Sequence, residues 1–117
     1  MPEDADTDTP LIDTLAVMTA ASVENTNLDA RELMLVRVAA LVSTGAPAAS
    51  YVLNVGAATD AGITLDDVQD VLVAVAPIAG TSRVVAATAN IARALGFVVL
   101  AAAELEAEIE EAEGADD

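Results

Sequence analysis

The sequence predicts a single all-α domain built from five to six helices. Apolar residues recur at helical spacing in successive segments, and glycine, proline or short polar stretches separate those segments. No segment shows the sustained alternation of apolar and polar residues that is typical of a half-buried β-strand. The 117 residues are enough for one hydrophobic core, so we expect one domain.

The clearest helical signal lies between Thr64 and Gly80. Thr64 and Asp67 form a capping box, in which each side chain accepts a hydrogen bond from the other residue's backbone N–H. Pro77 removes a backbone donor near the end of this helix, and Gly80 is a typical helix stop. Apolar residues occupy one helical stripe and many positions beside it, so we expect this helix to be buried on most sides.

Three helices are expected before this one. The first begins at Pro10, a residue that is favoured at the first helical position, and runs to about Val23. The second opens with another capping box, formed by Asp29 and Glu32. The third is a helix of small residues that covers residues 48–61.

The helix that follows Gly80 is expected to end at Gly96, and a further apolar segment comes after it. This segment keeps a helical stripe while it enters a run of six glutamates between residues 104 and 113. Negative charge near a helix C-terminus is unfavourable, so the last turns should fray unless something holds them. The stripe consists of Val98, Ala102, Leu105, Ile109 and Ala112.

The net charge of −16 is concentrated at the two ends of the chain. Residues 1–9 carry −4, residues 10–103 carry −4, and residues 104–117 carry −8. We therefore expect an acidic, disordered leader over 1–9, a single helical domain over 10–103, and an acidic helix end or tail over 104–117. Nucleic acid is not expected as a partner, because these charges would repel phosphates.

The chain contains no cysteine and no histidine. This excludes disulfides, thiol nucleophiles, metal sites built from Cys or His, and acid–base chemistry by imidazole. We expect neither a cofactor nor a bound metal.

The apolar content predicts contacts with other copies of the chain rather than with a membrane. The longest apolar run, residues 94–103, is too short to cross a bilayer, and no export-like segment begins the chain, so a cytoplasmic location is expected. Apolar residues make up 55% of the chain, but it has only one Phe, one Tyr and no Trp. A core of such small side chains buries little area per residue, so another copy is expected to cover part of the apolar surface.

Several short segments, in their order along the chain, resemble one known family. They are Leu28-Asp29-Ala30-Arg31-Glu32-Leu33, Val38-Ala39-Ala40-Leu41, Ala61-Gly62-Ile63-Thr64-Leu65-Asp66-Asp67-Val68 and Ala79-Gly80. Together they resemble the carboxymuconolactone decarboxylase family, which includes the alkylhydroperoxidase D-like proteins, over about residues 27–95. The resemblance implies an alkylhydroperoxidase D-like helical bundle that assembles as a trimer or hexamer, with its site near subunit interfaces.

The chain departs from this family at the positions that carry its chemistry. The redox branch has a C-x-x-C-x-x-x-H motif on the helix before the A-G-[IVL]-T turn, and its three positions fall on Pro47, Ser50 and Asn54. A disulfide and an activated thiolate are therefore excluded, and peroxidase activity should be absent. The decarboxylase branch also implies a histidine at Asn54, and an amide cannot shuttle protons near neutral pH.

Five residues remain as candidates for a site. The resemblance gives Glu32 a role beside the cysteine pair, which makes it the candidate catalytic residue, although it also completes a capping box. Arg37 is a candidate for binding a substrate carboxylate, with a surface or interface ion pair as the alternative. Ser50, Tyr51 and Asn54 offer polar groups to a substrate, and ordinary packing is the alternative for the two hydroxyls.

Three functional hypotheses follow. The leading one is a homo-oligomer without redox activity that acts by assembly or by binding a small ligand. One alternative is a decarboxylase or lactone-isomerase type of enzyme acting on a small carboxylic acid, in which Glu32 moves protons and Arg37 anchors the carboxylate. The other is an interaction module that recruits a basic partner through residues 104–117.

Overall fold

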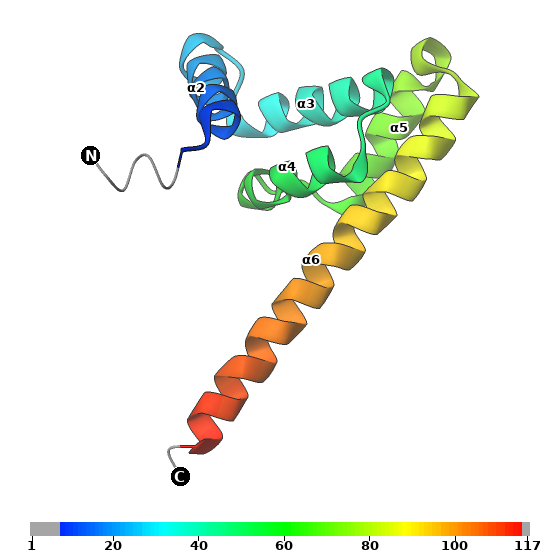
Figure 1. Cartoon of the computed structure of the whole chain (residues 1–117). Coiled ribbons are helices and arrows are strands. Elements are labelled where there is room, and N and C mark those ends of the chain that lie inside the picture. Colours follow the sequence, from blue (N-terminus) through cyan, green and yellow to red (C-terminus); the bar gives the residue numbers. More distant parts are fainter. Residues whose placement is uncertain (1–7, 116–117) are drawn as a thin grey trace.

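The computed structural model describes residues 8–115 and contains five α-helices, which confirms the all-α prediction (Figure 1). No strand occurs within this range. Most of the expected acidic leader, residues 1–7, and the last two residues of the tail lie outside the described part. The helices are α2 (Pro10–Asn25), α3 (Ala30–Thr44), α4 (Ala48–Asp60), α5 (Leu65–Ala79) and α6 (Thr81–Ala115).

Both predicted capping boxes are present. At the start of α3, Asp29 Oδ1 accepts from the Glu32 backbone N–H at 2.8 Å, and Glu32 Oε1 accepts from the Asp29 N–H at 3.0 Å. At the start of α5, Thr64 Oγ1 accepts from the Asp67 N–H at 3.1 Å, and Asp67 Oδ2 accepts from the Thr64 N–H at 2.8 Å. These contacts satisfy backbone donors that an uncapped helix start leaves unpaired.

Glycine ends two of the helices but does not end the last one. Gly45 closes α3 with a φ of 72°, and Gly80 closes α5 with a φ of 90°, both in the region that favours glycine. The predicted stop at Gly96 is wrong, because α6 continues through it to Ala115. A glycine inside a helix costs only about 1 kcal/mol relative to alanine, and the surrounding alanines and leucines are strong helix formers.

Helices α3, α4, α5 and the first half of α6 pack into one body. Helix α3 lies against α5, and α4 lies against α6. The core cluster is small, because it is built from Val38 and Val42 of α3, Val71 of α5 and Ala87 of α6. Val42 is fully buried. Such short side chains let the helices approach closely but cover little apolar area.

Helix α2 and the second half of α6 extend away from this body (Figure 1). No residue of α2 is buried, and no other helix packs against its backbone within residues 8–115. Its polar link to the body runs from Arg37 Nη2, which donates to Ser22 Oγ at 3.2 Å. Beyond Gly96, every residue of α6 with a described side chain is exposed except the half-buried Val98.

Helix α5 differs from its prediction because only one of its faces is covered. Val71 is buried against α3 and α6, but Val73 is 69% exposed and Ile78 is 87% exposed. The prediction of burial on most sides is therefore wrong for the single chain. In a body of four helices, a helix at the edge has neighbours on one side only.

The described chain exposes more large apolar side chains than it buries. Seven apolar residues are buried, whereas eighteen large ones are exposed, mainly on α2, on the outer face of α5 and beyond Gly96. Over residues 81–114, α6 is also long and apolar enough to cross a membrane by length and composition alone. One such helix is weak evidence of a membrane protein.

Candidate functional site

A cavity of about 250 Å³ lies among the four helices of the body. Its wall is made by α3, α4, the turn between α4 and α5, the start of α5 and the middle of α6. Most of the lining side chains are aliphatic, and none of the fourteen lining residues is charged. The polar residues among those that line the cavity are Tyr51, Asn54, Thr59 and Thr64.

Tyr51 is the most distinctive residue of the cavity. Its side chain is only 6% exposed, and its hydroxyl finds no hydrogen-bond partner among the described residues. A buried hydroxyl without a partner costs about 1–3 kcal/mol. Burial also raises the pKa of the Tyr51 phenol, so the group keeps its proton and remains a hydrogen-bond donor.

Asn54 lies where the cavity meets a second, shallower hollow. It contributes to the walls of both, and its Nδ2 donates to the Ser50 backbone carbonyl at 2.8 Å. The hollow also contains Arg37 of α3 and residues of α2 that include Ser22. A molecule that spans both spaces would therefore meet Asn54 between the uncharged cavity and the guanidinium of Arg37.

The three positions that correspond to the redox motif occur in the first half of α4. Pro47 is the N-cap residue, Ser50 is in the first turn, and Asn54 follows one turn later. The Ser50 backbone N–H donates to the Pro47 carbonyl at 3.0 Å. Asn54 reaches the cavity wall, whereas Pro47 and Ser50 are not among the lining residues.

Glu32 is separated from the other candidate residues. It is exposed at the start of α3, where its carboxylate caps the helix, and it lines neither the cavity nor the hollow. The structure thus brings Tyr51 and Asn54 together at the cavity and leaves Arg37 in the adjoining hollow. Whether Glu32 takes part in chemistry stays a prediction.

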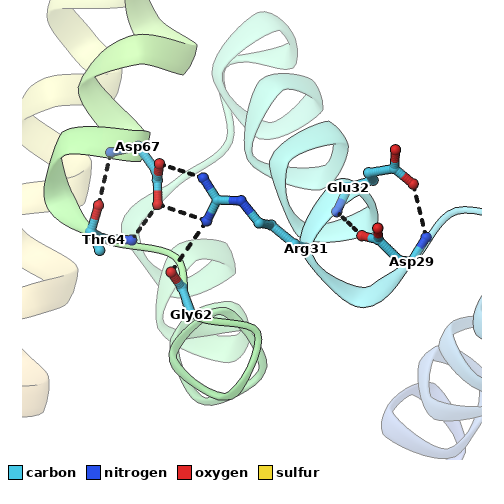
Figure 2. A network of polar contacts seen from close by, with 6 residues as sticks. All are labelled: Asp29, Arg31, Glu32, Gly62, Thr64 and Asp67. Carbon is cyan, nitrogen blue, oxygen red and sulfur yellow. Dashed lines mark hydrogen bonds and ion pairs between the residues drawn. The ribbon is translucent and has the colours of Figure 1, made fainter.

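An ion pair that we did not predict joins α3 to the start of α5 (Figure 2). Arg31 Nη2 contacts Asp67 Oδ1 at 2.6 Å, and Arg31 Nη1 contacts Asp67 Oδ2 at 3.0 Å, so the pair is bidentate. Arg31 Nη1 also donates to the Gly62 carbonyl at 3.3 Å. The hydrogen bonds from Arg31 and from the Thr64 backbone hold the pKa of the Asp67 carboxyl well below its ordinary value.

This ion pair fixes one wall of the cavity. Residues 63–65 line the cavity, and they lie between Gly62 and Asp67, the two residues that Arg31 contacts. The pair also connects residues 28–33 with residues 61–68, the two longest segments of the family resemblance. The sequence held a partial signal for this ion pair, because Asp67 belongs to one capping box and Arg31 lies within the other. Nothing in the sequence pattern indicated that the two capping boxes lie close together.

Comparison with known proteins shows which family the chain belongs to. The carboxymuconolactone decarboxylase family matches residues 11–94, which confirms the resemblance, and the chain is a member of this family. The match runs from α2 to the middle of α6 and leaves out residues 97–114. No match was found among curated proteins or among solved structures. Within residues 8–114, no group of three or more Asp, Glu, His or Cys side chains is arranged to hold a metal ion.

Proposed function

We propose that this member of the carboxymuconolactone decarboxylase family binds a small, uncharged, mainly apolar molecule in the cavity and catalyses no redox reaction. The observation that carries the proposal is the cavity wall, which is mainly aliphatic and free of charge. Tyr51 is one of its lining residues, and its buried hydroxyl lacks a partner among the described residues. A carbonyl or ether oxygen of the ligand would accept a hydrogen bond from it. Asn54 would help to orient the same polar group.

The size and polarity of the cavity support this class of ligand. An apolar cavity of about 150 Å³ in another protein takes up benzene, so a cavity of about 250 Å³ accommodates one ring with a short substituent. A carboxylate would be disfavoured inside the cavity, because moving a charge into apolar surroundings without a partner is costly.

The lack of thiols supports the non-redox part of the proposal. Peroxide reduction in the manner of the redox branch needs one thiolate to attack and a second thiol to resolve the product. The chain contains no cysteine, and Pro47, Ser50 and Asn54 occupy the motif positions. No other side chain of this sequence closes a disulfide cycle.

Assembly with further copies is the second part of the proposal. Membership of the family favours a trimer or hexamer, and the exposed apolar side chains of α2 and of the outer face of α5 supply surface that other copies would cover. Helix α2 is the leading candidate for such an interface, because it lies within the family match and none of its residues is buried. A cytoplasmic location is proposed along with it.

An enzyme acting on a small carboxylic acid is the alternative that the hollow favours. The ligand carboxylate would pair with Arg37 while its apolar part entered the cavity past Asn54. This scheme keeps Glu32 as the residue that would move protons, although Glu32 lines neither the cavity nor the hollow of the described chain. Assaying small unsaturated lactone acids with wild type and with Glu32→Gln tests it, and unchanged turnover in the variant removes Glu32 from the mechanism.

A pair of matched probes separates the two proposals. Cyclohexanone is neutral and carries one hydrogen-bond acceptor, whereas cyclohexanecarboxylate has a similar ring and a negative charge. Binding of each probe is measured by ligand-observed NMR. We expect saturable binding of cyclohexanone that Tyr51→Phe weakens about three- to tenfold, the value of one neutral hydrogen bond. Preference for the carboxylate, lost in Arg37→Met, would instead support the alternative.

Arg37→Met and Tyr51→Phe serve as controls for each other, because each changes one of the two adjoining spaces and leaves the other intact. If cyclohexanone does not bind, or if Tyr51→Phe leaves its affinity unchanged, the proposal of a neutral ligand is wrong.

A further inference from the structure

The distal segment of α6, residues 97–114, carries an apolar stripe that continues the buried stripe of the body. Within the body, Val84, Ala87, Ile91 and Ala94 are buried or half-buried and face the other helices. Beyond the body the stripe continues at spacings of three and four residues, but Leu105 is 58% exposed and Ile109 is 50% exposed. The distal stripe consists of Val98, Ala102, Leu105, Ile109 and Ala112.

This spacing is the heptad pattern of a helix that pairs with another helix. The distal stripe spans residues 98–112, which is roughly 22 Å at 1.5 Å per residue. Apart from the half-buried Val98, no helix of residues 8–115 covers it, and Figure 1 shows this half of α6 running clear of the others. The segment also lies outside the family match, so membership of the family does not account for it.

The negative charges beside the distal stripe limit which kind of partner can cover it. Glu106, Glu108 and Glu113 flank it at the heptad positions that contact a paired helix, and residues 97–114 contain no lysine or arginine. The negative end of the helix macrodipole lies in the same place as these carboxylates. A partner with positive charge beside an apolar face would relieve both effects.

A second copy of this chain does not meet that requirement. Pairing two distal segments in parallel would set Glu108 of one copy beside Glu113 of the other, and such like charges are destabilising. The chain has four arginines, and all of them lie on α3 or on the half of α6 that belongs to the body. Helix α2, which has an exposed apolar face, carries acidic residues and no basic ones.

We propose that the distal segment of α6 binds an amphipathic helix of a different protein, one that has an apolar face flanked by lysine or arginine. The apolar stripe supplies the contact area, and the three flanking glutamates select a basic partner. This proposal does not depend on the cavity or on its ligand.

A designed peptide tests it on the full-length protein. The probe is about three heptads long, with leucine at positions a and d and lysine at e and g. Its control has the same composition in scrambled order, so that its charge is equal but its stripe is lost. Binding is measured by titration calorimetry, and we expect the ordered peptide to bind at least about tenfold more tightly than the scrambled one.

Two sets of variants locate the binding surface. Leu105→Ser with Ile109→Ser should weaken binding of the ordered peptide at least about tenfold, whereas Leu53→Ser with Ile78→Ser, a more exposed pair on α4 and α5, should leave it unchanged. Glu106→Gln, Glu108→Gln and Glu113→Gln together should reduce the dependence of the affinity on salt. Circular dichroism verifies that each variant keeps its helices.

Three results would overturn the proposal. The first is equal binding of the ordered and scrambled peptides, or binding that Leu105→Ser with Ile109→Ser does not alter. The second is a change of oligomeric state in that variant, seen by sedimentation, because a second copy would then cover the stripe. The third is binding of the chain to neutral phosphatidylcholine vesicles through Leu105 and Ile109 without binding of the peptide, because the stripe would then serve a membrane.

Discussion

The packed body and the two projecting segments are built from the same kinds of residue but differ in what surrounds them. The body has two capping boxes, a bidentate ion pair and a cavity, and its apolar stripes meet one another. Helix α2 and the distal segment of α6 have similar apolar stripes but no cover. Local pattern is therefore enough to predict that a helix forms, whereas burial depends on contacts that come from elsewhere.

The largest expected difference between the two regions concerns a pair of methionines. Met34 of α3 is 3% exposed and Met18 of α2 is 61% exposed. Met34→Ala should lower the free energy of unfolding by about 2–4 kcal/mol, because it leaves a cavity in the body. Met18→Ala should change it by less than about 0.5 kcal/mol in dilute solution, as is usual for a surface substitution.

Urea unfolding at several protein concentrations checks both values. If other copies cover α2, the effect of Met18→Ala should grow as the protein concentration rises, whereas the effect of Met34→Ala should stay constant. A large effect of Met18→Ala at every concentration would show that α2 packs within its own chain, and the comparison would fail.

A smaller difference is expected between two threonines at helix starts. Thr64 caps α5 through its side chain, whereas Thr9 makes no side-chain hydrogen bond to the backbone of α2. Thr64→Ala should destabilise the protein by about 1 kcal/mol. Thr9→Ala should have little effect, because its hydroxyl donates to the Asp13 carboxylate and caps nothing. Thermal unfolding of the two variants gives the comparison, and equal losses would contradict it.

The smallest expected effect is a change in acid sensitivity. The pKa of Asp67 is lower in the folded chain than its ordinary value of 3.8, so its contribution to stability is present above about pH 4 and is lost as the pH falls further. Asp67→Asn should therefore lose less stability than wild type between about pH 5 and about pH 2. The matched change in α2 is Asp13→Asn. In the wild-type chain the Asp13 carboxylate accepts a hydrogen bond from the Thr9 hydroxyl rather than from an arginine.

Thermal unfolding across this pH range measures the change in acid sensitivity. The variant Arg31→Met tests the same effect independently. That variant removes the main cause of the low pKa of Asp67, so its acid profile should approach that of Asp67→Asn. An acid profile of Arg31→Met that stays as steep as that of wild type would show that the ion pair has no part in acid sensitivity.

Much of the fold could be predicted because helix starts and stops are local. The capping boxes at Asp29 and Thr64, the start at Pro10 and the stop at Gly80 depend on residues within one turn. The stop predicted at Gly96 is wrong because a single glycine inside a helix costs only about 1 kcal/mol and is therefore a weak stop signal. The exposed outer face of α5 was missed because periodicity shows which residues are apolar but not which neighbours exist.

The candidate site was harder to predict because it depends on distance in space. Tyr51 and Asn54 were named from their place on one helix, and the structure brings both to the cavity. Arg31 was missed, because its partner Asp67 is 36 residues away and an ion pair at that separation leaves no periodic trace. The lack of a partner for the Tyr51 hydroxyl is a property of the packed body and cannot be read from a sequence.

Because α6 is continuous through Gly96, a small tilt of the helix at the cavity becomes a larger displacement at its far end. Leu95 is part of the cavity wall, and Ala112 lies 17 residues further along the same uninterrupted helix, roughly 26 Å away at 1.5 Å per residue. A tilt of about 5° at the cavity would therefore displace the far end by about 2 Å, more than the change at the wall itself.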